Sequence, residues 1–85
     1  MVIVTKHAVN RYIERGESLE VNQAFNYLLK TLNPLKHKLM EALDIVQDVR
    51  VPLDNEMLAI CIKNKKNLVV KTCRKRKYKW SRLMH

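Results

Sequence analysis

The spacing of the apolar residues changes near residue 44, and this change restricts the fold more than any other feature of the chain. Between Ser18 and Leu32 the apolar residues recur every three or four positions, as on the buried side of an amphipathic helix. From Val49 to Leu53 they alternate with other residues, as in a half-buried strand. The sequence therefore predicts helices first and strands afterwards, the order of an α+β domain.

Residue types that begin and end helices divide the N-terminal half. Thr5 is a suitable N-cap and Gly16 a suitable C-terminal stop, so the segment between them is predicted to be the first helix. Ser18 is the predicted N-cap of the second helix. Pro34 interrupts that helix, because proline disfavours the α conformation at the residue before it. Proline also suits the start of a helix, so a third one is predicted to run to about Leu43.

Three β-prone segments in the second half are predicted to form an antiparallel meander. They are residues 49–53, 57–63 and 68–73. The β-branched run Val2–Val4 is a further candidate for an edge strand. We predict an α+β fold with two or three N-terminal helices packed on one face of a three- to four-stranded antiparallel sheet. Residues 1–80 are predicted to form a single domain and residues 81–85 a flexible tail.

The charges are unevenly distributed along the chain. Residues 1–56 hold all 8 acidic side chains and 7 basic ones, whereas residues 57–85 hold 10 basic side chains and no acidic one. Clustered charge of one sign repels itself and usually marks a surface that receives a polyanion. The sequence therefore predicts nucleic acid, RNA in particular, as the partner. The alternative is that the charge serves solubility alone.

Several classes of protein are disfavoured by the sequence. Motifs for nucleotide hydrolysis or metal binding are absent, so we expect no metal and no cofactor. An apolar stretch long enough for a membrane span is also absent, and a cytoplasmic location without membrane partners is expected. Cys61 and Cys73 have no partner at metal-ligand spacing and are expected to be small apolar residues, with a disulfide between neighbouring strands as the alternative.

The polar side of the first predicted helix carries the residues best suited to phosphate chemistry. His7, Arg11 and Arg15 recur every four positions, which places them in one stripe. An imidazole can move a proton near neutral pH, and guanidinium groups bind phosphate with two hydrogen bonds. The alternative is an ordinary solvated stripe in which an arginine pairs with Glu14 or Glu17.

The last predicted strand and the basic segment after it supply a second set of candidates. Alternation places Thr72 and Arg74 on one sheet surface, where a hydroxyl and a guanidinium could form half of a phosphate site. The residues predicted to bind nucleic acid are Lys71, Lys75, Arg76, Lys77, Tyr78, Lys79 and Arg82. For Trp80, and for Tyr78, packing on the core is the alternative to stacking on bases.

Two segments resemble a widespread bacterial and phage family of uncharacterised small domains. Residues 5–16 match its helix motif, roughly T-K-H-A-x-x-R-x-x-E-R-G, and residues 69–74 match its final strand, V-V-x-T-x-R. The family is similar in layout to RelE-like and colicin-type ribonucleases, which cut RNA without a metal. The resemblance implies that His7 is a general acid or base and that Arg11, Arg15, Thr72 and Arg74 bind phosphate or the transition state.

The leading hypothesis is a small metal-independent endoribonuclease, either a toxin of a toxin–antitoxin pair or a phage effector, or else an inactive relative. The alternative is a phage or bacterial adaptor without catalytic activity. Such an adaptor would bind nucleic acid, or an acidic protein such as an antitoxin or a host protein, through the basic C-terminal third.

Overall fold

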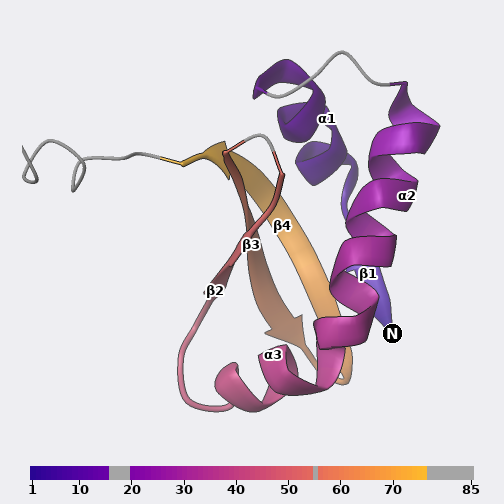
Figure 1. Ribbon diagram of the computed structural model, residues 1–85. Coiled ribbons are helices and arrows are strands. Elements are labelled where there is room, and N and C mark those ends of the chain that lie inside the picture. The colour runs from indigo at the N-terminus through magenta and orange to yellow at the C-terminus, as the bar shows by residue number, and fades with distance from the viewer. Residues whose placement is uncertain (16–19, 55, 77–85) are drawn as a thin grey trace, which may run out of the picture.

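The computed structural model describes residues 1–15, 20–54 and 56–76, and its α+β class is the one predicted (Figure 1). The helices are α1 (Lys6–Arg15), α2 (Val21–Leu32), the 3-10 helix η1 (Asn33–Leu35) and α3 (Lys36–Ala42). The strands are β1 (Val2–Val4), β2 (Val49–Pro52), β3 (Met57–Asn64) and β4 (Asn67–Lys75).

The sheet has the order β1-β4-β3-β2 and is mixed, so the prediction of a purely antiparallel sheet is wrong for one pair. Strands β2, β3 and β4 form the predicted antiparallel meander. Strand β1 pairs in parallel with β4, from Val2 opposite Leu68 to Val4 opposite Val70. A parallel pair needs a long crossover, and here nearly the whole chain lies between the two strands. Three β-branched residues cannot encode that direction locally.

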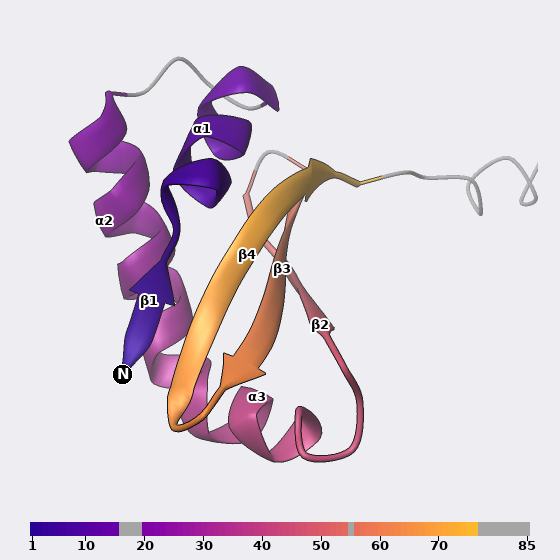
Figure 2. The ribbon, with the colours of Figure 1, turned by 180° about the vertical axis from the view of Figure 1, so that it is seen from behind.

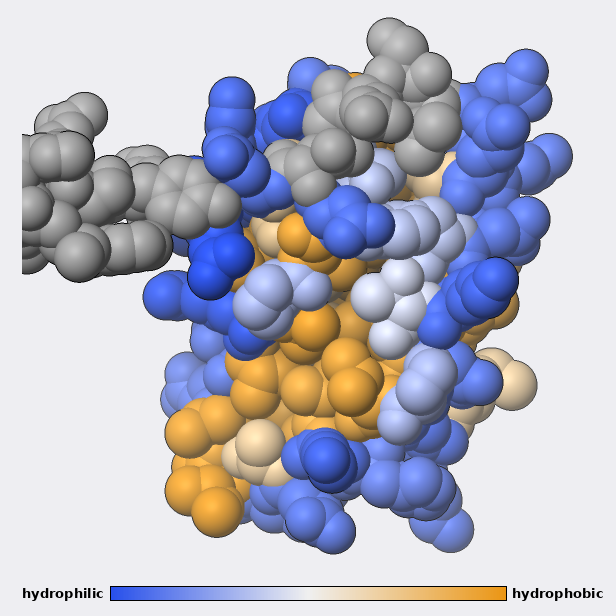
Figure 3. Space-filling view, in the orientation of Figure 1, coloured by the Kyte–Doolittle hydropathy of each residue, from blue (hydrophilic) through white to orange (hydrophobic). Residues whose placement is uncertain are grey.

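The helices cover one face of the sheet, as predicted. Helix α1 packs along β4, and α2 lies against both α1 and β1 (Figures 1 and 2). The buried core residues come from both layers: Val2, Ala8, Val9, Tyr12, Ala24, Leu28, Leu32, Leu43, Val51, Leu53, Met57, Ala59, Cys61, Leu68, Val70 and Cys73. Between β2 and the helices α2 and α3 the cover is thinner, and hydrophobic surface is visible there (Figure 3).

Two details of the helical half differ from the prediction. Glu20 is the N-cap of α2 and forms a capping box with Gln23, whereas Ser18 lies outside the described residues. Asn33 keeps the α conformation, with φ −57° and ψ −44°, although Pro34 follows it. The chain accommodates this proline in the first turn of η1, where a proline nitrogen needs no hydrogen-bond partner.

Thr5 joins the first helix to the last strand. Its hydroxyl accepts a hydrogen bond from the Ala8 N–H at 3.1 Å, which confirms the predicted N-cap. The same hydroxyl donates to the Val70 carbonyl at 2.7 Å, and the Thr5 N–H donates to that carbonyl at 3.3 Å. The residue that caps α1 therefore also holds this helix against β4.

Replacing Thr5 with valine is expected to lower the free energy of unfolding by about 2 kcal/mol. Valine keeps the branched shape but removes both a helix cap and a hydrogen bond to the sheet, each worth roughly 1 kcal/mol. Urea unfolding followed by circular dichroism measures the change. Thr5→Ser, which keeps the hydroxyl, is the matched control, and equal losses in both variants would contradict this role.

Cys61 and Cys73 are free thiols buried on the helix-covered face of β3 and β4. They are offset along the two strands, since Cys61 lies opposite Val70 and Cys73 opposite Ala59. Burial raises the pKa of Cys61 to about 12, with a smaller contribution from the neighbouring Cys73, and raises the pKa of Cys73 to about 11. Both thiols are therefore protonated at neutral pH.

We expect the two thiols to react with iodoacetamide at least about 100-fold more slowly in the folded protein than in urea at pH 8, because so little thiolate is present. A raised pKa in the folded state also means that the unfolded chain loses these protons first. Stability should therefore fall as pH rises from about 9 towards 11. Rapid labelling of the folded protein would show that the thiols are accessible.

Candidate functional site

Helix α1 presents the predicted polar stripe. Ala8, Val9 and Tyr12 are buried on the side that faces the sheet and α2. His7 and Arg15 are exposed and Arg11 is partly buried. The four-residue spacing therefore separates the core side of the helix from the polar stripe, as the sequence predicted.

One pocket is lined by residues of both the first helix, α1, and the last strand, β4. It has a volume of about 450 Å³ and is lined by His7, Arg11, Arg15, Thr72, Cys73, Arg74 and Lys75. All five residues that the sequence nominated as catalytic lie in this lining. Three come from α1 and two from β4, so neither segment contains the pocket on its own.

The pocket exists because β1 is shorter than β4. Strand β1 covers the edge of β4 only from Leu68 to Val70, and the chain then turns into α1. From Lys71 onward the edge of β4 faces the polar stripe of α1 instead of another strand. The register of β4 against β3 shifts at this point and leaves Lys71 without a partner, as in a β-bulge.

Thr72 and Arg74 belong to the sheet face that carries no helix. Thr72 lies opposite Ile60 and Arg74 opposite Leu58, and both of these β3 residues lie outside the core cluster. The predicted pairing of Thr72 with Arg74 on one surface is therefore present. Both residues also line the pocket from β4, while His7, Arg11 and Arg15 line it from α1.

The pocket lining is basic. It holds three arginines, one lysine and one histidine, and no acidic side chain among the described residues. Glu14 lies next to the pocket, 3.9 Å from the Arg11 guanidinium, in an exposed contact between successive helical turns. An exposed pair at this distance offsets little charge. The predicted alternative of Arg11 pairing with Glu14 is thus present as a loose contact, and Glu17 lies outside the described residues.

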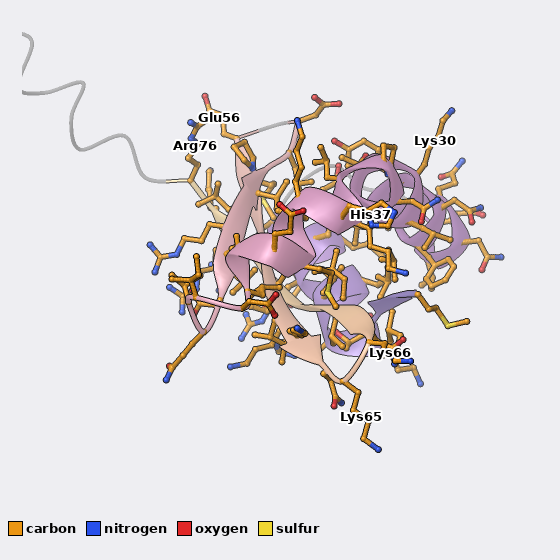
Figure 4. All side chains as sticks on the ribbon, turned by 90° about the horizontal axis from the view of Figure 1, so that it is seen from below. Lys30, His37, Glu56, Lys65, Lys66 and Arg76 are labelled. Atoms are coloured by element: carbon orange, nitrogen blue, oxygen red, sulfur yellow. The ribbon has the colours of Figure 1, made fainter. Side chains whose placement is uncertain are left out.

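The other predicted nucleic-acid ligands continue from the pocket. Lys71 and Lys75 are exposed on β4, and Arg76 follows it, with its N–H donating to the Glu56 carbonyl at 2.6 Å. In Figure 4, Arg76 lies beside Glu56, far from the hairpin turn that carries Lys65 and Lys66. Lys77, Tyr78, Lys79, Trp80 and Arg82, together with the predicted tail of residues 81–85, lie outside the described residues.

Two features of the surface were missed by the sequence analysis. Cys73 is part of the pocket lining although the residue as a whole is buried. A second pocket, of about 410 Å³, is mainly apolar and lies between β1, α1 and α2, with Val4, Val9, Val21 and Phe25 in its lining. Alternation along β4 could have suggested the first feature, but the second depends on how the two helices pack.

Other kinds of site find no support in the described part of the chain. No three His, Cys, Asp or Glu side chains there are grouped to hold a metal ion. No helix of residues 1–15, 20–54 and 56–76 has the length and apolar character to cross a membrane. Comparisons with protein-family models, with curated proteins and with solved structures found no match.

Proposed function

We propose that the protein is a small metal-independent endoribonuclease of the RelE-like kind, with its active centre in the pocket between α1 and β4. The supporting observation is that one basic pocket collects an imidazole, three guanidinium groups and a hydroxyl from opposite ends of the chain. These are the groups needed to bind a phosphodiester and to move a proton beside it.

In the proposed reaction the 2′-hydroxyl oxygen of the RNA attacks the adjacent phosphorus, and the bond from phosphorus to the 5′-oxygen breaks. The products are a 2′,3′-cyclic phosphate and a free 5′-hydroxyl. His7 either takes the proton from the 2′-hydroxyl or gives a proton to the leaving 5′-oxygen, and the other proton is exchanged with water. Arg11, Arg15 and Arg74 offset the charge that builds up on the phosphate oxygens, and the Thr72 hydroxyl donates a hydrogen bond to one of them.

Positive charge next to the pocket supports binding of an RNA strand. Lys71 and Arg76 flank the lining on β4 and just after it, and Lys75 is part of it. Lysine and arginine contacts to phosphates make binding strongly dependent on salt, because counterions are released. The expected partner is therefore RNA, which a protein located in the cytoplasm would encounter.

The test is to incubate the protein with end-labelled RNA in EDTA and to identify the ends of the products. We expect fragments that carry 2′,3′-cyclic phosphate, and an apparent affinity that falls at least about tenfold between 50 and 200 mM salt. RNA in which all sugars are 2′-deoxy should bind without being cut. Products with 3′-hydroxyl ends, or cleavage that requires a divalent metal, would contradict the mechanism.

A non-catalytic adaptor is the second candidate, and the helix-free face of the sheet favours it. This face carries an apolar group made of Ile3, Leu58, Ile60, Ile62 and Val69. Arg50, opposite Ile60, and Arg74, opposite Leu58, add positive charge. An acidic protein with apolar residues of its own would fit such a face. RNA binding without cleavage in the experiment above would favour this function.

A further inference from the structure

Half of one edge of strand β4 has no neighbouring strand. Strand β1 pairs with this edge only from Leu68 to Val70. Beyond Thr5 the chain continues as α1, and the pocket lies along the rest of the edge. A main-chain group of this edge that is also exposed is therefore available to a molecule in the pocket.

Main-chain hydrogen bonds on both sides of β3 fix which residues of β4 point toward this edge. In an antiparallel pair, residues that exchange main-chain hydrogen bonds alternate with residues that do not. The Arg76 N–H donates to the Glu56 carbonyl at 2.6 Å, so residues 56, 58 and 60 of the β3 segment direct their main-chain groups to β4. The Leu53 N–H donates to the Met57 carbonyl at 2.7 Å, so Met57 faces β2 instead.

It follows that the N–H groups of Cys73 and Lys75 point away from β3. Cys73 lies opposite Ala59 and Lys75 opposite Met57, the β3 residues that face β2. Val70, on the other side of the bulge, shows the same edge in use, because its carbonyl accepts the Thr5 N–H. Lys75 is exposed, whereas Cys73 with its main chain included is only 1% exposed, so of these two amides only that of Lys75 is accessible from the pocket.

We propose that the main-chain N–H group of Lys75 is a phosphate ligand within the pocket. It donates a hydrogen bond to a phosphate oxygen of the bound nucleic acid, and the edge of β4 thereby fixes the position of that phosphate in the same pocket as His7. This identification of the ligand as RNA rests on the proposed function.

Main-chain donors suit this task better than the surrounding side chains alone. The arginines of the pocket are long and partly or fully exposed, so binding must fix their conformations. The Lys75 amide is already held in place by the pairing of β4 with β3. Its position does not change with pH, and a donor fixed in advance stabilises developing negative charge most effectively.

The test compares two substitutions at one position. Lys75→Pro removes both the amide and the ammonium group, whereas Lys75→Ala removes only the ammonium group. Proline is tolerated where the N–H is not used by the sheet, and the extended residue before it is also favourable. We expect Lys75→Pro to bind a 2′-deoxy oligonucleotide about tenfold more weakly than Lys75→Ala, the size of a hydrogen bond to a charged group.

A second measurement does not depend on a folded proline variant. In the unsubstituted protein, the amide NMR signal of Lys75 should move downfield on titration with inorganic phosphate, and more so with the 2′-deoxy oligonucleotide. Equal affinities of the two variants, or an unmoved Lys75 amide signal while binding is measurable, would overturn the inference. A shifted Lys75 amide in a protein that cuts no RNA would uphold this phosphate site and reject only the ribonuclease function.

Discussion

Replacing His7 with alanine is expected to lower the rate of RNA cleavage by about 10²- to 10⁴-fold, the usual contribution of a positioned acid or base. RNA affinity should change by less than about threefold, because the arginines of the pocket and the basic residues beside it remain. Single-turnover cleavage of labelled RNA gives the rate, and binding to a 2′-deoxy strand gives the affinity.

His37 provides the matched control for this experiment. It is exposed on α3 and is not part of the pocket lining (Figure 4). His37→Ala removes the same side chain from the same surface environment and should leave the cleavage rate unchanged. Equal rates for the His7 and His37 variants would remove His7 from the mechanism. If the RNA affinity and the cleavage rate of the His7 variant fall by the same factor, His7 contributes to RNA binding and not to proton transfer.

Replacing Tyr12 with alanine is expected to lower the free energy of unfolding by about 3–5 kcal/mol, as for other large aromatic residues in a core. Tyr12 is 2% exposed, and its ring stacks on Tyr27 with 5.4 Å between the ring centroids. It lies on α1, the helix that carries His7 and packs on β4. A domain of this size has only about 5–15 kcal/mol of stability in total, so much of the protein should unfold near 37 °C.

Urea unfolding measures this loss, with Tyr12→Phe and Phe25→Ala as controls. Tyr12→Phe keeps the ring and its stacking and isolates the hydroxyl group. Phe25 on α2 is 38% exposed, so its removal should cost clearly less than the removal of Tyr12. A loss at Tyr12 no larger than at Phe25 would show that α1 is not anchored through this ring.

Loss of the Tyr12 ring should also affect the pocket before the whole domain unfolds. The stripe of His7, Arg11 and Arg15 keeps its place beside β4 only while α1 is docked. Cleavage by the Tyr12→Ala variant at low temperature should therefore be weaker than its folded fraction predicts. This result would show that Tyr12 positions α1. A residue that acted only in the chemistry would leave the free energy of unfolding unchanged when replaced.

The elements of this fold were largely predictable because their signals are local. Helix α1 has the predicted bounds, since Thr5 caps it and its apolar residues fall on one side. Strands β2, β3 and β4 follow from β-prone segments separated by a turn. The predicted interruption at Pro34 is also local: α2 ends at Leu32, and a single 3-10 turn accommodates the proline before α3 begins.

The candidate site was predictable only as two separate halves. The sequence nominated His7, Arg11 and Arg15 from helical spacing, and Thr72 and Arg74 from strand alternation together with a family resemblance. Their meeting in one pocket depends on the parallel pairing of β1 with β4, which brings the start of α1 to the end of the last strand. Such pairing joins residues more than 60 positions apart, and no local pattern encodes it.

The sequence by itself determined the helices, the meander and the concentration of charge in the last third, because each depends on neighbouring residues or on simple counting. The tertiary structure alone decided that β1 is parallel and ends at Val4, and that the edge of β4 beyond Val70 stays open. The physical reason is that strand partners are chosen by packing among distant segments. The Lys75 amide that points away from β3 is a consequence of that choice, so it became visible only in the folded chain.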